Sequence, residues 1–318
     1  MIKGFLRGEA PARALLAPIL FSLGSRLESV SLRSYQLNPT KIANALRQIR
    51  NVLRLDGVTC YFDPFLEAEA LGCKVEWPDE NTATLTSPVV SEVDELRQIM
   101  RTPAETLDHK KVQVAQEVLQ RLKTMLRDAP ALMISLNGPL ALAVQLNKGA
   151  TPNTVELLEF AAEVTTVLAT RFAEAGADVI LLRETPSPGE IQEPWSSALD
   201  PIINAIRFYE SLPVLLLKHD QPDQALPLTA YPHDNLQGSD TDNRANVGIA
   251  LSAGQLWNCD HDRNFMLQPL SGIMGGRVPL LVTTSEDVPL TTGMNVVASV
   301  LGDIRTWLSS SGESPLAV

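Results

Sequence analysis

Ionisable and polar side chains follow one short apolar run after another in this chain of 318 residues. If those runs are parallel strands, the residues that follow them meet at one end of a sheet, where carboxylates and an imidazole can transfer protons or bind a metal ion. A single residue of this kind could equally be a helix cap or a turn former, but repetition at successive run ends favours a functional site. The residues are Asp63, Asn137, Glu184, His219 with Asp220, and Glu286 with Asp287.

The apolar runs predict strands that are buried on both faces. Residues 131–136, 178–182 and 213–217 are rich in aliphatic side chains and have the length of strands. Segments with helical periodicity alternate with them. Strands are expected at 16–22, 56–63, 131–136, 178–182, 213–217, 247–251, 265–268 and 278–283, a hairpin at 73–90, and helices at 39–55, 91–99, 109–127, 154–175, 195–209 and 294–308.

This alternation predicts an α/β fold, a (β/α)8 TIM-type barrel with an N-terminal helical cover. A doubly wound open sheet is the alternative, although the sequence has no glycine-rich βα turn of the dinucleotide-binding type. Residues 1–308 are expected to form the barrel domain and residues 309–318 a flexible tail. Only residues 269–277 separate the seventh and eighth expected strands, and a crossover needs about a dozen residues or more. An irregular C-terminal closure is therefore expected, through a lost helix or a seventh strand that lies elsewhere.

Composition and charge exclude several classes of partner. The chain has 26 Lys and Arg against 37 Asp and Glu, a formal charge of −11, and no basic run that could neutralise a nucleic-acid backbone. Its longest apolar stretches, such as 14–23, are shorter than the roughly 20 residues of a membrane span. The three cysteines include no CxxC pair, which is typical of a reducing compartment. A cytoplasmic protein with no nucleic-acid or membrane partner is expected.

Four segments of the chain carry further motifs in a fixed order. They are YFDPFLEAEALGCKVEW at 61–77, NGPLALAVQLNKG at 137–149, FAEAGADVI at 172–180 and RVPLLVTTSEDVPLTTGMNV at 277–296. Together they resemble the uroporphyrinogen decarboxylase-like superfamily, with its "FSD" aspartate, its "GAPWTL…EG" block, its "AGAD" strand entry and its closing strand and helix start. The resemblance implies the same barrel and allows a homodimer.

One chemistry implied by the resemblance is decarboxylation. The family's aspartate accepts pyrrole N–H groups and stabilises positive charge as CO2 leaves, and Asp63 matches it. The N-terminal arginine motif of the family has no counterpart, although Arg26 and Arg33 lie in that region. Gln145 stands in place of a tyrosine, and Glu286 in place of a histidine. An octa-anionic porphyrinogen needs cationic groups, so turnover of uroporphyrinogen III itself is not expected.

The other implied chemistry is methyl transfer. Thiol-directed members hold zinc with His-x-Cys after one strand and Cys after the last. Here His219 is followed by Asp220 and Gln221, and Glu286 stands in place of the last cysteine. The thiolate set is therefore absent. A carboxylate-rich zinc site of Glu184, His219 and Glu286 is the alternative, because carboxylates and imidazoles also bind zinc.

The leading hypothesis is a cofactor-free decarboxylase (a lyase) acting on a carboxylated small molecule, with a tetrapyrrole-related acid as one option. Asp63 would stabilise charge or handle a proton, His219 would act as acid or base, and Glu184 would be its partner. The alternatives are a metal-assisted methyltransferase that takes a methyl group from a methylated substrate or a corrinoid protein, and a non-catalytic member that binds a tetrapyrrole or a partner protein. Substrate-binding roles are expected for Asn137, Gln145, Asp220 and Glu286.

Overall fold

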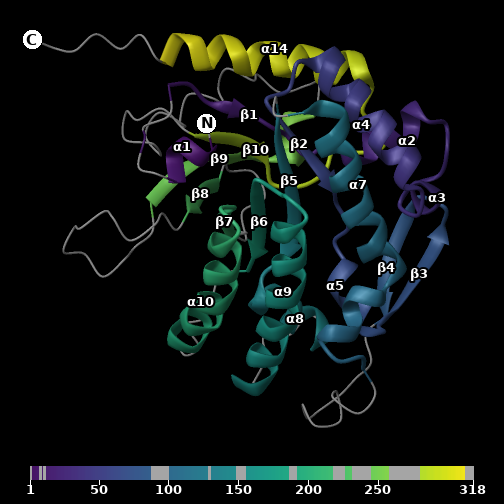
Figure 1. Cartoon of the computed structure of the whole chain (residues 1–318). Helices are drawn as coiled ribbons and strands as arrows, with labels where there is room; N and C mark the ends of the chain where they lie inside the picture. Colours follow the sequence, from purple (N-terminus) through teal and green to yellow (C-terminus); the bar gives the residue numbers. More distant parts are fainter. Residues whose placement is uncertain are drawn as a thin grey trace, which may run out of the picture.

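In the part of the chain that the structure describes, eight strands form one sheet that curls into a barrel. The computed structural model describes residues 2–6, 9, 12–86, 100–127, 130–147, 155–185, 192–217, 226–230, 245–257 and 280–311. The strand order is β1-β10-β9-β8-β7-β6-β5-β2 (Figure 1). The strands are β1 (Leu15–Leu16), β2 (Gly57–Tyr61), β5 (Ala131–Asn137), β6 (Val179–Glu184), β7 (Leu212–Leu217), β8 (Leu226–Ala230), β9 (Ala245–Leu251) and β10 (Leu281–Thr284).

Helices cover the outside of this sheet. Figure 1 shows α9 and α10 side by side below β6 and β7, and α14 crossing the other end of the molecule. A separate hairpin follows α5. The helices are α1 (Ile2–Leu6), α2 (Phe21–Leu27), α3 (Leu32–Tyr35), α4 (Pro39–Leu53), α5 (Leu66–Leu71), the 3-10 helix η1 (Ala104–Asp108), α7 (Lys110–Leu126), α8 (Pro139–Leu146), α9 (Val155–Glu174), α10 (Gln192–Phe208), α11 (Ala253–Leu256) and α14 (Met294–Ser311), and the hairpin strands are β3 (Lys74–Asp79) and β4 (Thr82–Thr86).

The two outermost strands of the sheet meet at a narrow seam. No ladder of strand hydrogen bonds joins β1 to β2 among the described residues, but the Asp56 N–H, just before β2, donates to the Leu16 carbonyl at 3.0 Å. The Asp56 carboxylate also accepts the Leu16 N–H at 3.1 Å. Arg13 pairs with the same carboxylate at 2.7 Å and, with the Leu16 N–H, lowers its pKa against the effect of burial. The expected TIM-type barrel is therefore present, closed here by single contacts.

The third quarter of the chain departs from the expected alternation. β8 is antiparallel to both β7 and β9, whereas β9 and β10 pair directly and in parallel. That pairing leaves no place between β9 and β10 for the strand expected at 265–268, whose residues lie outside the described part. The strand that the sequence did not predict is β8. It contains Pro227, a residue disfavoured in central strands, and it does not belong to the alternation of strands and helices on which the prediction depended.

Other boundaries follow the sequence expectation with local corrections. The strand expected at 16–22 is wrong beyond Leu16, because helix α2 begins at Phe21. The Asp287 carboxylate stabilises that helix start by accepting the Ser22 N–H at 2.8 Å. The hairpin and the helices expected at 39–55, 109–127, 154–175, 195–209 and 294–308 are present, with α14 continuing to Ser311. The helix expected at 91–99 lies outside the described residues.

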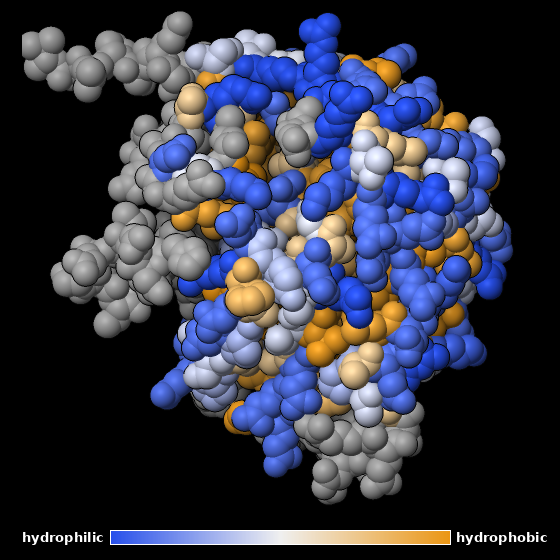
Figure 2. Space-filling view, in the orientation of Figure 1, coloured by the Kyte–Doolittle hydropathy of each residue, from blue (hydrophilic) through white to orange (hydrophobic). Residues whose placement is uncertain are grey.

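The core sits between the sheet and its helices. Every described aliphatic side chain of β5 and β6 from Leu132 to Leu182 is buried. The Phe21 ring packs at a tilt against both Tyr35 and Tyr61, with ring centroids 5.1 Å apart in each pair, so α2, α3 and β2 share one aromatic cluster. Figure 2 shows a largely hydrophilic outer face with small apolar patches. In the described parts of the chain, no helix has the length and apolar character needed to cross a membrane.

Candidate functional site

A buried three-way ion pair lies at the C-terminal end of β2. The Lys111 ammonium contacts the Asp63 carboxylate at 2.7 Å and the Glu69 carboxylate at 2.6 Å. The side chains of Lys111 and Asp63 are only 6% and 2% exposed. Burial by itself would lower the pKa of Lys111, but the two carboxylates raise it above its ordinary value. The other Asp63 oxygen accepts the Phe65 N–H at 2.9 Å, so this carboxylate is held in one orientation.

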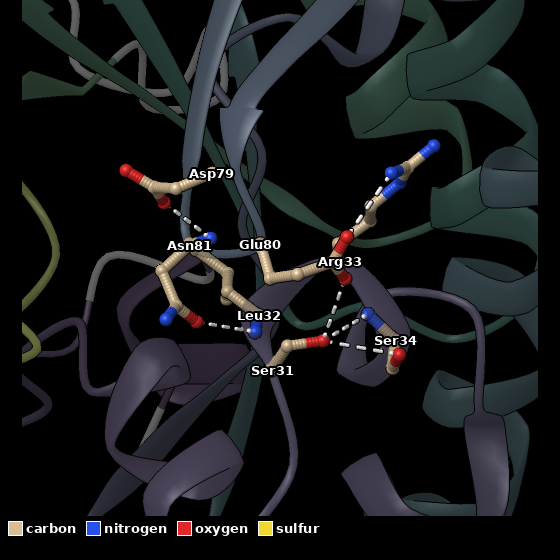
Figure 3. Close-up of polar contacts among 7 residues, drawn as sticks. All are labelled: Ser31, Leu32, Arg33, Ser34, Asp79, Glu80 and Asn81. Carbon is tan, nitrogen blue, oxygen red and sulfur yellow. Dashed lines mark hydrogen bonds and ion pairs between the residues drawn. The ribbon is translucent and has the colours of Figure 1, made fainter.

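The β3–β4 hairpin covers this ion pair. The Trp77 ring of β3 lies 5.6 Å from the Lys111 ammonium and 6.0 Å from the Arg33 guanidinium. Figure 3 shows how the turn of the hairpin is fixed to α3, through contacts of Glu80 and Asn81. Glu80 pairs with Arg33 at 3.2 Å, and the Asn81 side chain accepts the Leu32 N–H at 2.9 Å.

The two N-terminal arginines that the resemblance brought into question have structural partners. Arg33 pairs with Glu80, and Arg26 donates to the backbone carbonyls of Leu290 and Thr292. Both guanidinium groups thus hold segments of the protein together.

A second polar network joins β5 to α5. The Glu67 carboxylate accepts the backbone N–H of Asn137 at 2.7 Å and its side-chain amide at 2.8 Å. The amides of Asn137 and Gln145 both donate to the Pro64 carbonyl, at 2.9 Å each. Glu67 is fully buried, and this burial raises its pKa to about 7 against the lowering effect of Arg183 and of the Asn137 N–H. Asn137 and Gln145, expected to bind substrate, therefore lie together beside Asp63.

Arg183 occupies the end of β6, directly beside Asn137. Its guanidinium donates to the Asn137 side-chain oxygen at 3.0 Å and lies 4.7 Å from the centre of the Phe62 ring. The side chain is only 2% exposed. Its Nε–H has no hydrogen-bond partner in the described structure. A buried, incompletely paired guanidinium is costly, which makes this position a candidate site residue.

Glu184, the next residue of β6, points to the outer side of the barrel wall. Its carboxylate accepts four N–H groups: Leu140 at 3.0 Å, Ala141 at 2.8 Å, Trp195 at 3.0 Å and Thr185 at 3.2 Å. Each oxygen receives two of these donors, which fills the four acceptor positions of a carboxylate. Burial raises its pKa to about 7 against the lowering effect of these donors. Glu184 therefore caps the start of α8, and its donor set leaves no oxygen lone pair for a metal ion.

The remaining expected residues are only partly visible. His219 and Asp220 lie outside the described residues. Glu286 is half-buried after β10, and its backbone carbonyl accepts the Thr284 hydroxyl at 2.7 Å. Desolvation raises the pKa of its neighbour Asp287 to about 7, against the N–H and O–H donors of the α2 start. Within the described residues, no three His, Cys, Asp or Glu side chains are grouped so that they could hold a metal ion.

Sequence reasoning missed Lys111, Glu67 and Arg183. Arg183 carried a signal, since it is a charged residue that directly follows the apolar run of β6. Glu67 and Lys111 carried none, because each lies on a helix among other charged residues. Only the packing of α5 and α7 against the sheet places them beside Asp63 and Asn137.

The protein is a TIM-type barrel with a polar network at the C-terminal ends of β2, β5 and β6. Barrels of this type carry their active sites at that end. A model of the uroporphyrinogen decarboxylase (URO-D) family matches residues 2–195. The chain belongs to the URO-D family.

Comparison with solved structures extends the likeness of fold over nearly the whole chain. A methyltransferase from Methanosarcina mazei superposes with a TM-score of 0.67 at 14% sequence identity, and the match covers 96% of this chain and 98% of that chain. At this identity the likeness shows a shared fold. No curated protein matches the chain in sequence.

Proposed function

We propose that the protein is a carboxy-lyase that acts without a cofactor on a carboxylated small molecule. The observation that carries the proposal is the fixed geometry of Asp63, which Lys111 and the Phe65 N–H hold in place. The sequence resemblance matches this residue to the family's aspartate. A buried carboxylate held in one orientation can stabilise a cation that forms next to it without reorganisation.

In the proposed reaction, protonation of an electron-rich carbon places positive charge on the substrate, and Asp63 stabilises that charge. The bond to the carboxyl carbon then breaks, CO2 leaves, and the electron pair neutralises the cation. Lys111 contacts Asp63 at 2.7 Å, holds it in its orientation and is a positioning residue. His219 is proposed as the acid that delivers the proton. Glu184 supports the site by capping α8, where four N–H donors occupy both of its carboxylate oxygens.

The test is release of CO2 by the purified protein from a panel of heteroaromatic carboxylic acids that includes uroporphyrinogen III. We expect release from a member of the panel other than uroporphyrinogen III, and loss of that activity in Asp63→Asn. Asp108→Asn, an exposed aspartate of η1, is the matched control. Full activity in Asp63→Asn would refute the role of this residue. Porphyrin binding without CO2 release from any acid would instead favour a non-catalytic binding protein.

Methyl transfer is the second candidate, and the likeness of fold to a methyltransferase over the whole chain favours it. The methyl donor would be a methylated small molecule or a corrinoid protein. Zinc counted by elemental analysis of untagged protein separates the two candidates. About one zinc per chain, lost in His219→Ala, would contradict the cofactor-free lyase.

A further inference from the structure

Arg183 is the least satisfied charged group in the described part of the site. It stands at the end of β6 with its side chain almost fully buried. One face of its guanidinium is covered by Phe62, 4.7 Å away, and Asn137 accepts one of its N–H groups at 3.0 Å. The Nε–H remains without a partner among the described residues.

Asn137 can serve Arg183 only in one orientation. Its amide nitrogen donates to Glu67 and to the Pro64 carbonyl, so its oxygen must face the guanidinium. An aspartate here could not donate to Glu67, and a leucine could not accept from Arg183. The asparagine therefore fixes the guanidinium in position without neutralising its charge.

The nearest carboxylate in this network balances the charge incompletely. Glu67 reaches Arg183 only through Asn137 among the described residues, and its burial raises its pKa to about 7, which disfavours its ionised form. The charge of Arg183 is therefore partly uncompensated, in a setting where an unpaired ion is strongly disfavoured.

Further unpaired polar atoms share the same face of the sheet. Ser135 lies two residues before Asn137 on β5, and Asn137 is the register partner of Arg183. Alternation along the strand places Ser135, Asn137 and Arg183 on one face. The Ser135 hydroxyl, like the Thr59 hydroxyl of β2, is buried without a partner in the described structure. Glu184 instead contacts the start of α8, and Asp63 contacts Lys111 at the start of α7.

We propose that Arg183 binds a carboxylate of the substrate through its Nε–H edge, on the inner face of β6. Because the Phe62 ring covers one face of the guanidinium, the substrate is proposed to approach its edge. A carboxylate oxygen is the acceptor that this geometry favours. This inference rests on the proposed function, since it names the group by which the carboxylated substrate is held. Arg183 is thus a substrate-binding residue and Asn137 its positioning residue.

The test observes the Arg183 Nε–H signal in proton–nitrogen NMR spectra of the full-length protein. Contact of this proton with the Phe62 ring identifies the signal in the wild-type protein itself. Sodium acetate is the probe. The references are acetamide, which is uncharged, at the same concentration and sodium chloride at the same ionic strength. We expect a saturable shift with acetate alone. In Arg183→Lys, acetate binding is read from the side-chain amide signals of Asn137, which contacts this position. It should be roughly tenfold or more weaker than in the wild-type protein, because an ammonium lacks the planar edge.

Arg121→Lys is the matched control, because Arg121 pairs with Glu117 on the exposed face of α7. It should leave the acetate response unchanged. An Arg183 signal that does not move at saturating acetate would overturn the proposal, as would equal acetate affinity in Arg183→Lys.

The result can be separated from the fate of the lyase hypothesis. Acetate binding at Arg183 in a protein that releases no CO2 from any acid would overturn the lyase and retain this anion site. CO2 release with a KM unchanged by Arg183→Lys would retain the lyase and overturn the anion site at Arg183. If both hold, Arg183→Lys should raise KM roughly tenfold and leave kcat nearly unchanged, as expected for a group that binds substrate and transition state equally.

Discussion

Replacing Lys111 by methionine tests whether the buried ion pair beside Asp63 is as tightly coupled as its geometry indicates. The change keeps the length of the side chain and removes the ammonium from two carboxylates at 2.7 and 2.6 Å. Asp63 is then left as a buried charge whose only described donor is the Phe65 N–H. Removing one partner of a buried pair costs about 3–5 kcal/mol. Glu69, which is 22% exposed, can regain water and should contribute the smaller share.

Thermal unfolding at pH 7 is the assay, and a loss of this size lowers Tm by roughly 4–8 °C in a chain of this length. Lys123→Met, at an exposed lysine on the same helix, should change the unfolding free energy by less than about 0.5 kcal/mol. Adding Asp63→Asn to Lys111→Met should recover about 1–3 kcal/mol, the coupling expected for residues in contact. A Lys111→Met protein as stable as the Lys123→Met control would refute the coupling and, with it, the argument that Lys111 fixes Asp63.

Three further predictions concern the barrel wall, its seam and its titration. Gly138→Ala would place a Cβ 2.4 Å from the Glu184 carboxylate, and it should lower the unfolding free energy measured by chemical denaturation by about 1–3 kcal/mol. Gly302→Ala in α14 is the control: its Cβ would meet no atom within 4 Å, and it should raise the unfolding free energy by about 0.5–1 kcal/mol. Asp56→Ala removes the acceptor of the Leu16 N–H and should speed hydrogen exchange of that amide roughly tenfold at the seam; unchanged exchange would mean that the seam is held elsewhere. Because the pKa of Glu67 rises from 4.5 to about 7 on folding, the folded protein holds a proton that the unfolded chain releases, so this group's stabilisation is complete below about pH 4.5 and is lost as pH rises through about 7. Glu67→Gln should therefore flatten the fall in Tm between about pH 4.5 and pH 7, and an unaltered slope would contradict the raised pKa.

Much of the fold could be predicted from the sequence because the first half of the barrel obeys local rules. β5 and β6 are continuous apolar runs, and α9 carries a helical stripe of twenty residues. β8 could not be found in this way, since its pairing with β7 and β9 depends on tertiary contacts and reverses the expected direction. The URO-D model matches only residues 2–195, and the antiparallel strand lies beyond that range.

The candidate site was predictable only where a residue ends a strand. Asp63, Asn137 and Glu184 were found because each follows an apolar run. Their contacts differ for reasons that the sequence does not reveal. Glu184 can contact the start of α8 because Gly138 lacks a Cβ, whereas Asp63 pairs with Lys111, which is 48 residues away in the sequence.

The seam also sets an order of events for the nascent chain on the ribosome. β1 finds its ladder partner only in β10, and Thr283 donates its hydroxyl to the Ala17 carbonyl across 266 residues. At ordinary translation rates these segments emerge on the order of 10–50 s apart. Throughout that interval β1 has no strand to pair with, while β2, β5 and β6 need only the first 184 residues to assemble. The wall that carries Asp63, Asn137 and Arg183 can therefore form before the barrel closes, and closure awaits the last strand to be synthesised.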